Sequence, residues 1–214
     1  MQAIKLLKLL ERYLLMVALV GQAAQARETS DNSSTNQPVF LAELREESGI
    51  GQSVANRAYV TAGVERFSLL VPPGFRGRAS DPSRMTLVTT NFDRVFCMRS
   101  AGPIPLDGQP LDPETCRRSI ITAHPGAKIL QEFSRTADGR SGPVFDAEWT
   151  ESGGVGRRAR IAFIPSRRSI LEFSMLCSPD VFERGCQALN TIFATFRASD
   201  EKGELHISPL SDKL

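Results

Sequence analysis

Apolar and polar residues alternate along several stretches in the middle of the chain, and this period of two is typical of strands with one buried face. Short turns rich in Gly, Pro, Asp and Ser separate the last four stretches, and links of that length join antiparallel neighbours. The pattern therefore predicts a mainly antiparallel sheet. Its expected strands are Val64–Val71, Met85–Thr89, Arg94–Arg99, Ala127–Arg135, Val144–Thr150, Arg157–Ile164 and Ser169–Cys177.

The apolar spacing becomes helical after the last of these strands. Ser178-Pro179-Asp180 is a strong helix start, and one face of the following helix carries Phe182, Cys186, Leu189, Ile192, Phe193 and Phe196. Asp112-Pro113-Glu114 opens a second, shorter helix, with Asp as the cap and Pro in the first turn. Ile170 and Leu176 make the outer side of the last strand partly apolar. We expect an α+β fold, a twisted, mainly antiparallel sheet with helices on both faces.

Two motifs made of core and turn residues support this architecture. The first is Phe67–Phe75, which reads F-S-L-L-V-P-P-G-F, and the second is the ending formed by Ile170–Leu176, Phe182 and Ile192–Phe196. The first resembles the opening pattern F-x-L-x-x-P-x-G-F/W of the PsbP/Mog1/DcrB-like superfamily, and the ending is similar to that of the same superfamily. The resemblance covers about residues 59–197 and implies an α/β/α sandwich.

The resemblance implies little about activity, because the superfamily includes a photosystem accessory subunit, a small-GTPase binder and bacterial envelope proteins. The chain departs from the pattern in its four cysteines and in its long segment 76–112. No functional residue of the superfamily maps onto a position of this sequence.

The first 26 residues have the three parts of a secretory signal peptide. Lys5, Lys8 and Arg12 precede an apolar run that is too short to span a membrane, and Ala24-Gln25-Ala26 is a small-x-small cleavage site. We expect export to the periplasm or the exterior, with Arg27 as the first mature residue and no integral membrane segment after cleavage. The alternatives are an N-terminal helix that belongs to the fold and an organelle transit peptide.

Signal cleavage changes the charge of the chain. The precursor has 26 basic and 24 acidic residues, and removing three basic and one acidic residue leaves 23 of each sign. A neutral mature chain lacks the broad positive field that nucleic-acid binding uses, so we expect no nucleic-acid partner.

Composition divides the rest of the chain into three parts. Residues 27–58 are expected to be a mostly disordered linker, with a short helix as one alternative around Val39–Leu44. Residues 59–197 form a single domain of ordinary size. Residues 198–214 are expected to be a flexible C-terminal tail.

Four cysteines lie in the mature chain: Cys97, Cys116, Cys177 and Cys186. An even count in an exported protein favours disulfides, and four cysteines allow three pairings. We favour Cys97–Cys116 and Cys177–Cys186, because each closes a short loop. None of these spacings is typical of a zinc site, and we expect no metal and no other cofactor.

Three groups of residues invite a catalytic or ligand-binding interpretation. His124 lies in a turn-like context that is typical of a surface residue, and Gly153-Gly154-Val155-Gly156 is flanked by strands and reads as a hairpin turn. Asp146 and Glu148 share one strand face, and Trp149 on the opposite face is expected in the core. None of these predicts a catalytic or cofactor-binding residue.

The strand register assigns the arginine-rich stretch a structural role. If Phe145, Ala147 and Trp149 face the core, antiparallel pairing sets Asp146 opposite Arg160 and Glu148 opposite Arg158. Opposite charges across two strands stabilise a sheet. We therefore expect a solvated hairpin with two cross-strand ion pairs and no anion site.

These observations favour a non-enzymatic envelope or secreted protein that binds another protein or assists an assembly. The partner is an unknown envelope or extracellular protein. The alternatives are a carrier of a small ligand or lipid and a hydrolase with an unrecognised site.

Overall fold

A computed structural model of the chain describes residues 39–48, 54–77, 81–104 and 110–199. The expected signal peptide, most of the expected linker and the expected tail beyond Ser199 lie outside these ranges.

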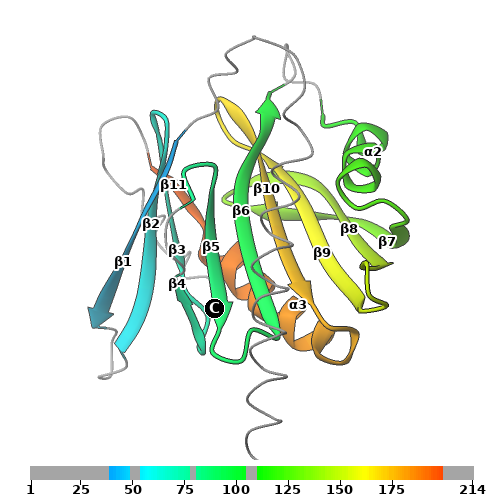
Figure 1. Cartoon of the computed structure of the whole chain (residues 1–214). Helices are drawn as coiled ribbons and strands as arrows, with labels where there is room; N and C mark the ends of the chain where they lie inside the picture. The colour runs from blue at the N-terminus through cyan, green and yellow to red at the C-terminus, as the bar shows by residue number, and fades with distance from the viewer. Residues whose placement is uncertain (1–38, 49–53, 78–80, 105–109, 200–214) are drawn as a thin grey trace, which may run out of the picture. The chain divides into compact units, whose positions relative to one another are not determined.

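The described chain forms two antiparallel sheets (Figure 1). The larger sheet has seven strands in the order β4-β5-β6-β10-β9-β8-β7. These are β4 (Phe75–Gly77), β5 (Arg84–Thr89), β6 (Arg94–Pro103), β7 (Lys128–Ala137), β8 (Arg140–Thr150), β9 (Gly156–Pro165) and β10 (Ser169–Cys177). The smaller sheet has the order β1-β2-β3-β11, with β1 (Phe40–Ser48), β2 (Val54–Ala62), β3 (Glu65–Leu70) and β11 (Arg197–Ser199).

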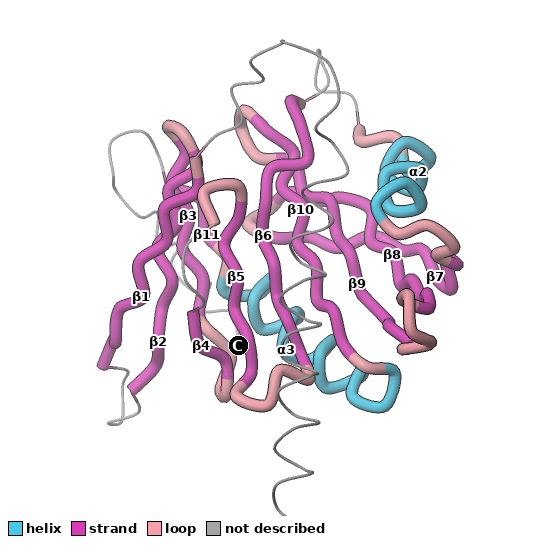
Figure 2. The backbone as a smooth tube through the Cα atoms, viewed as in Figure 1, coloured by secondary structure: helices cyan, strands magenta, loops and turns pink. Residues whose placement is uncertain are grey.

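Two α-helices lie in the described ranges of the chain, and Figure 2 shows them well apart. In α2 (Pro113–Ala123), the Asp112 carboxylate accepts hydrogen bonds from the backbone N–H groups of Glu114 and Thr115, which confirms the expected cap. A 3-10 turn, η2 (Pro179–Val181), leads into α3 (Phe182–Thr195), which confirms the helix predicted after Ser178.

The larger apolar core contains residues of both sheets and of α3. Phe67 and Leu69 come from the smaller sheet, Phe96 and Phe173 from the larger one, and Leu189 from α3. The ring of Phe173 lies edge-on to that of Phe196, with centroids 5.1 Å apart. The apolar face predicted for the last helix is therefore buried.

A second apolar cluster joins α2 to the other set of alternating residues in β8 and β9. It includes Cys116 and Ile120 from the helix and Phe145, Trp149 and Ile161 from the strands. Neighbouring residues of β8 belong to different clusters, because successive side chains of a strand point to opposite faces. The buried position of Trp149 confirms the sequence prediction.

The expectation of one sheet and a preceding linker is wrong. Residues 40–48 and 54–62 are strands, and with β3 and β11 they build a second sheet. The buried side of β2 consists of Ala58, Val60 and Ala62, so its apolar signal is weak, and most of β1 is exposed on both faces. The folded part also continues beyond the expected domain end at residue 197, because Arg197–Ser199 pairs with β3.

The expected disulfides are wrong as well, since all four cysteines are free thiols. Cys97 lies on β6, three strands from β8, whereas Cys116 packs among β8 and β9 side chains. At about 4.8 Å per strand this separation exceeds the reach of a disulfide. In the second expected pair, Cys177–Cys186, it is Gly185 of α3 that faces the Cys177 thiol, because a Cβ added to Gly185 would lie 2.4 Å from the Cys177 Sγ. Cys186 is one residue further and points about 100° away around the helix.

Candidate functional site

Asp146 and Arg160 lie opposite each other in the β8–β9 register, as the sequence suggests. Arg160 donates two hydrogen bonds to the carboxylate, Nε to Oδ1 at 2.7 Å and Nη2 to Oδ2 at 2.8 Å. Only 12% of the Arg160 side chain and 3% of the Asp146 side chain are exposed. The expectation of a solvated hairpin face is therefore wrong for this pair.

Two aromatic rings help to bury the guanidinium of Arg160. Its guanidinium lies 4.9 Å from the ring centroid of Phe133 on β7 and 5.7 Å from that of Phe182 at the start of α3. Glu148 lies opposite Arg158, but the Arg158 guanidinium stacks over the same Phe182 ring at 4.2 Å. Both carboxylate oxygens of Asp146 accept hydrogen bonds from Arg160. Asp146 and Glu148 therefore do not form an acid–base site.

His124 is the C-cap of α2, and its ring stacks on Trp149 with centroids 4.0 Å apart. The expectation of an exposed turn histidine is therefore wrong. Burial, with the positive charge of Arg99 adding to it, lowers the pKa of His124 to about 4. Arg99 itself donates from Nη2 to the Glu172 carboxylate at 2.7 Å. At neutral pH this histidine is uncharged and serves as a packing residue.

We expect this neutral histidine to make the fold sensitive to acid. Because its pKa is lowered on folding, the stability it contributes is present above pH 6.5 and is lost as the pH falls towards 4. His124→Phe keeps a ring on Trp149 and takes up no proton. Urea unfolding of both proteins across this range should show a smaller loss in the variant, and parallel curves would contradict the assignment.

The cysteines do not supply a nucleophile. Burial raises the pKa of Cys97, Cys116 and Cys186 to about 11 and that of Cys177 to about 12. A thiol is reactive as the thiolate, which these values disfavour at neutral pH. Within the described residues, no group of three or more His, Cys, Asp and Glu side chains is arranged to hold a metal ion.

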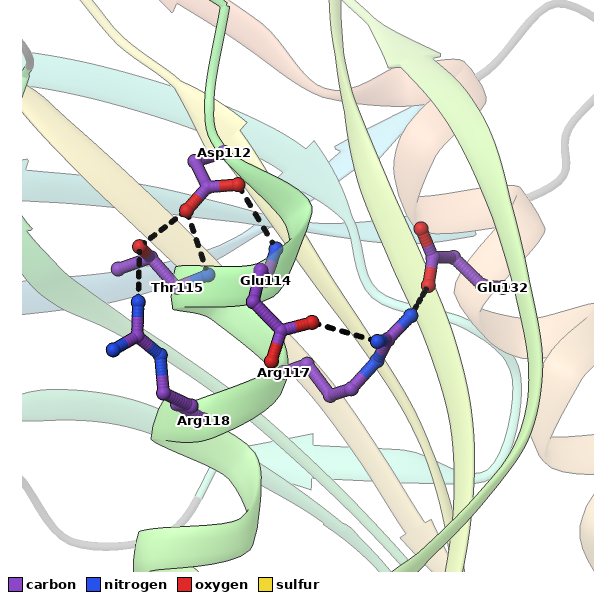
Figure 3. Close-up of polar contacts among 6 residues, drawn as sticks. All are labelled: Asp112, Glu114, Thr115, Arg117, Arg118 and Glu132. Atoms are coloured by element: carbon purple, nitrogen blue, oxygen red, sulfur yellow. Dashed lines mark hydrogen bonds and ion pairs between the residues drawn. The ribbon is translucent and has the colours of Figure 1, made fainter.

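The first turn of α2 carries a network of charged side chains (Figure 3). Arg117 donates from Nη1 to Glu114 at 2.7 Å and also contacts the carboxylate of Glu132 on β7. Arg118 donates to the Thr115 hydroxyl at 3.4 Å, and that hydroxyl donates to Asp112. The network joins the helix to the edge of the larger sheet, and its charges are largely matched.

Hydrogen bonds of Glu65 link the smaller sheet to the β9–β10 turn. Its carboxylate accepts hydrogen bonds from the Ser166 hydroxyl at 2.9 Å, the Arg167 backbone N–H at 2.9 Å and the Ser169 hydroxyl at 3.1 Å. The best-formed hollow in the described part of the chain lies beside it, lined by Arg66 and Arg168 among others, and encloses about 20 Å³. That is room for about one water molecule, well below the volume of a ligand pocket.

Strand β1 has the strongest features of an interaction surface. It forms one edge of the smaller sheet and lies at the left of Figure 1. At and beside this edge lie three exposed large apolar residues, Val39, Leu41 and Leu44, with 54%, 63% and 40% of their surface accessible. An exposed apolar edge strand is a template for pairing with another strand. The sequence pattern does not reveal this strand, because apolar residues on both faces obscure the period of two.

The hydrogen bonds at the start of β1 show which backbone groups point outward. The Val39 carbonyl accepts from the Gly63 N–H at the β2 side, whereas the Phe40 N–H donates to the Pro82 carbonyl at 2.7 Å. Successive residues of an antiparallel strand point their backbone N–H and C=O groups to opposite sides of the strand. Ala42, Leu44 and Glu46 therefore point these groups away from β2, towards the open edge.

Comparisons with known proteins fall into two groups. No family model matches the sequence, and no curated protein matches it. Solved structures do match. The chain is similar in structure to PsbP and to Mog1p. Both names belong to the superfamily whose pattern the motif Phe67–Phe75 resembles.

The PsbP structure is cyanobacterial PsbP from Synechocystis sp. PCC 6803, with 12% identity, a TM-score of 0.45, and coverage of 78% of this chain and 96% of that one. Mog1p of Saccharomyces cerevisiae, a Ran-binding protein, has 13% identity, a TM-score of 0.45, and coverage of 73% and 95%. LpqN of Mycobacterium tuberculosis, which is involved in cell envelope biogenesis, has 13% identity, a TM-score of 0.39, and coverage of 74% and 91%.

Among the described residues, no helix has the length and apolarity to cross a membrane.

Proposed function

We propose that this protein is an exported, non-enzymatic domain that binds another protein by adding a strand to the edge of β1 that pairs with no other described strand. Export rests on the signal-peptide pattern of residues 1–26. The α/β/α sandwich that the sequence resemblance implies would hold the smaller sheet, and with it this edge, at one side of the domain.

The observation that carries the proposal is the combination of outward backbone groups and exposed apolar side chains on one edge strand. Ala42, Leu44 and Glu46 offer donors and acceptors, and Leu41 and Leu44 offer apolar surface beside them. In strand addition the main chain supplies affinity and alternate side chains supply specificity. The neutral His124 and the protonated thiols support a binding role over a hydrolytic one.

Ala42→Pro tests the proposal. The N–H of this residue points away from β2, so proline removes a donor to a partner strand while leaving the β1–β2 ladder intact. We expect thermal stability within about 1 kcal/mol of the parent chain and about tenfold weaker partner binding. The measurement is photo-cross-linking from position 41 in the full chain, with mapping of the cross-linked partner peptide by mass spectrometry.

Two controls accompany the measurement. Ala42→Thr keeps the N–H and should keep the adduct. A cross-linker at Val155, an exposed apolar residue in the β8–β9 turn, should give no comparable adduct. Equal adducts with Ala42→Pro and Ala42→Thr would rule out strand addition at β1.

A further inference from the structure

The charges along β1 fit a second copy of the same strand. Glu43 and Arg45 lie on the outer face of the sheet, joined by an ion pair of 2.8 Å between Arg45 Nη2 and Glu43 Oε2, with 62% and 58% of their side chains exposed. By contrast, the Arg57 Nε on β2 donates to Glu47 at 2.9 Å in a more buried pair. On the outer face of β1, Glu43 and Arg45 are therefore the more accessible charges.

Twofold symmetry and the alternating direction of the backbone N–H and C=O groups restrict how two copies of β1 can pair. In a twofold antiparallel pair, outward residues must face outward residues, so the axis passes through one residue of the strand. An axis at Glu43 or Arg45 sets like charges against each other, and an axis at Glu46 sets that carboxylate against itself. An axis at Ala42 creates no charge pair. Only an axis at Leu44 sets Glu43 of each copy opposite Arg45 of the other.

We propose that the strand added at this edge is β1 of a second copy, in the register that places Leu44 opposite Leu44 and Glu43 opposite Arg45. The inference rests on the proposed function and names its partner. In this register Glu43 and Arg45 of the two copies contribute four alternating charges, and opposite charges facing each other across strands stabilise the pair.

The same register uses the backbone and the apolar residues of the edge. Leu44 of each copy exchanges both backbone hydrogen bonds with Leu44 of the other, and Ala42 pairs with Glu46 in the same way. The two Leu44 side chains meet on the inner face, where Leu44 already lies close to Gly77: a Cβ added to Gly77 would be 2.8 Å from the Leu44 Cδ1. The result is one continuous eight-stranded sheet formed from two four-stranded sheets.

Charge reversal tests both the dimer and its register. Analytical ultracentrifugation of the full chain from about 1 to 500 µM should show a concentration-dependent dimer. Glu43→Arg and Arg45→Glu each create two like-charge contacts, so each should raise the dimer dissociation constant about tenfold or more. An equimolar mixture of the two variants restores every opposite-charge contact and should form a mixed dimer with the parental dissociation constant.

Glu46→Arg is the matched control, since it makes the same change of charge at a residue that faces Ala42 of the other copy. Its dissociation constant should stay within about threefold of the parent value. A parent chain that remains monomeric, single variants that dimerise like the parent, or a mixture that stays monomeric would each overturn the inference. The strand-addition proposal would survive any of these results if Ala42→Pro, unlike Ala42→Thr, still weakened the cross-link to a different protein.

Discussion

Asp146→Ala should lower the free energy of unfolding by about 3–5 kcal/mol, because it leaves the Arg160 guanidinium buried without a counter-charge. The parent pair is nearly inaccessible to water and makes two hydrogen bonds of 2.7 and 2.8 Å. The carboxylate also holds the pKa of Arg160 above its ordinary value. Urea unfolding followed by tryptophan fluorescence measures the loss.

Two further variants separate burial from charge. Glu114→Ala removes a carboxylate from the exposed pair with Arg117 and should cost about 1 kcal/mol or less. The double variant Asp146→Leu/Arg160→Met replaces the whole buried pair with apolar side chains and should recover most of the lost stability. A loss of less than about 1 kcal/mol in Asp146→Ala would mean that the pair is solvated after all.

Gly142→Ala should destabilise the protein by about 3 kcal/mol or more, since overpacking against fixed backbone forces the strands apart. A Cβ at this position on β8 would lie 1.8 Å from the Phe163 carbonyl oxygen and 3.4 Å from the Ile164 Cα. These atoms belong to the neighbouring strand β9, so no side-chain rotation relieves the contact.

Gly156→Ala is the matched control for that change. Gly156 also belongs to the β8–β9 hairpin, but a Cβ there would meet only the Pro179 Cγ at an ordinary 3.6 Å. We expect a change within about 0.5 kcal/mol, with the midpoint of thermal unfolding as the readout. Equal effects of the two alanines would show that β8 and β9 are further apart at Gly142 than the structure places them.

The pairing of the central strands was predictable from the sequence because it depends on local pattern. A period of two over β8 and β9, with a glycine turn between them, allows few registers, and a slip of one residue exposes Trp149. The same applies to α2 and α3, whose starts are set by Asp112 and by the residues after Ser178. Local hydrogen bonding and side-chain spacing determine these elements without reference to distant residues.

The edge strand and the cysteines were not predictable in this way. The nine residues of β1 carry apolar side chains on both faces, so only pairing with β2 defines them as a strand. The free thiols depend on how α2 and α3 pack, because one residue on a helix decides whether Gly185 or Cys186 faces Cys177. Sequence spacing between cysteines contains no information about that rotation.

The antiparallel strand order from β7 to β10, the two helix starts and the opposition of Asp146 and Arg160 follow from periodicity and short turns, which are local features of the sequence. Which of these faces meets water depends instead on packing between elements. Phe133 on β7 and Phe182 on α3 close over Arg160, and Trp149 covers His124. Burial depends on contacts between elements distant in sequence, and these contacts bury Asp146 and partly bury Arg160 and His124.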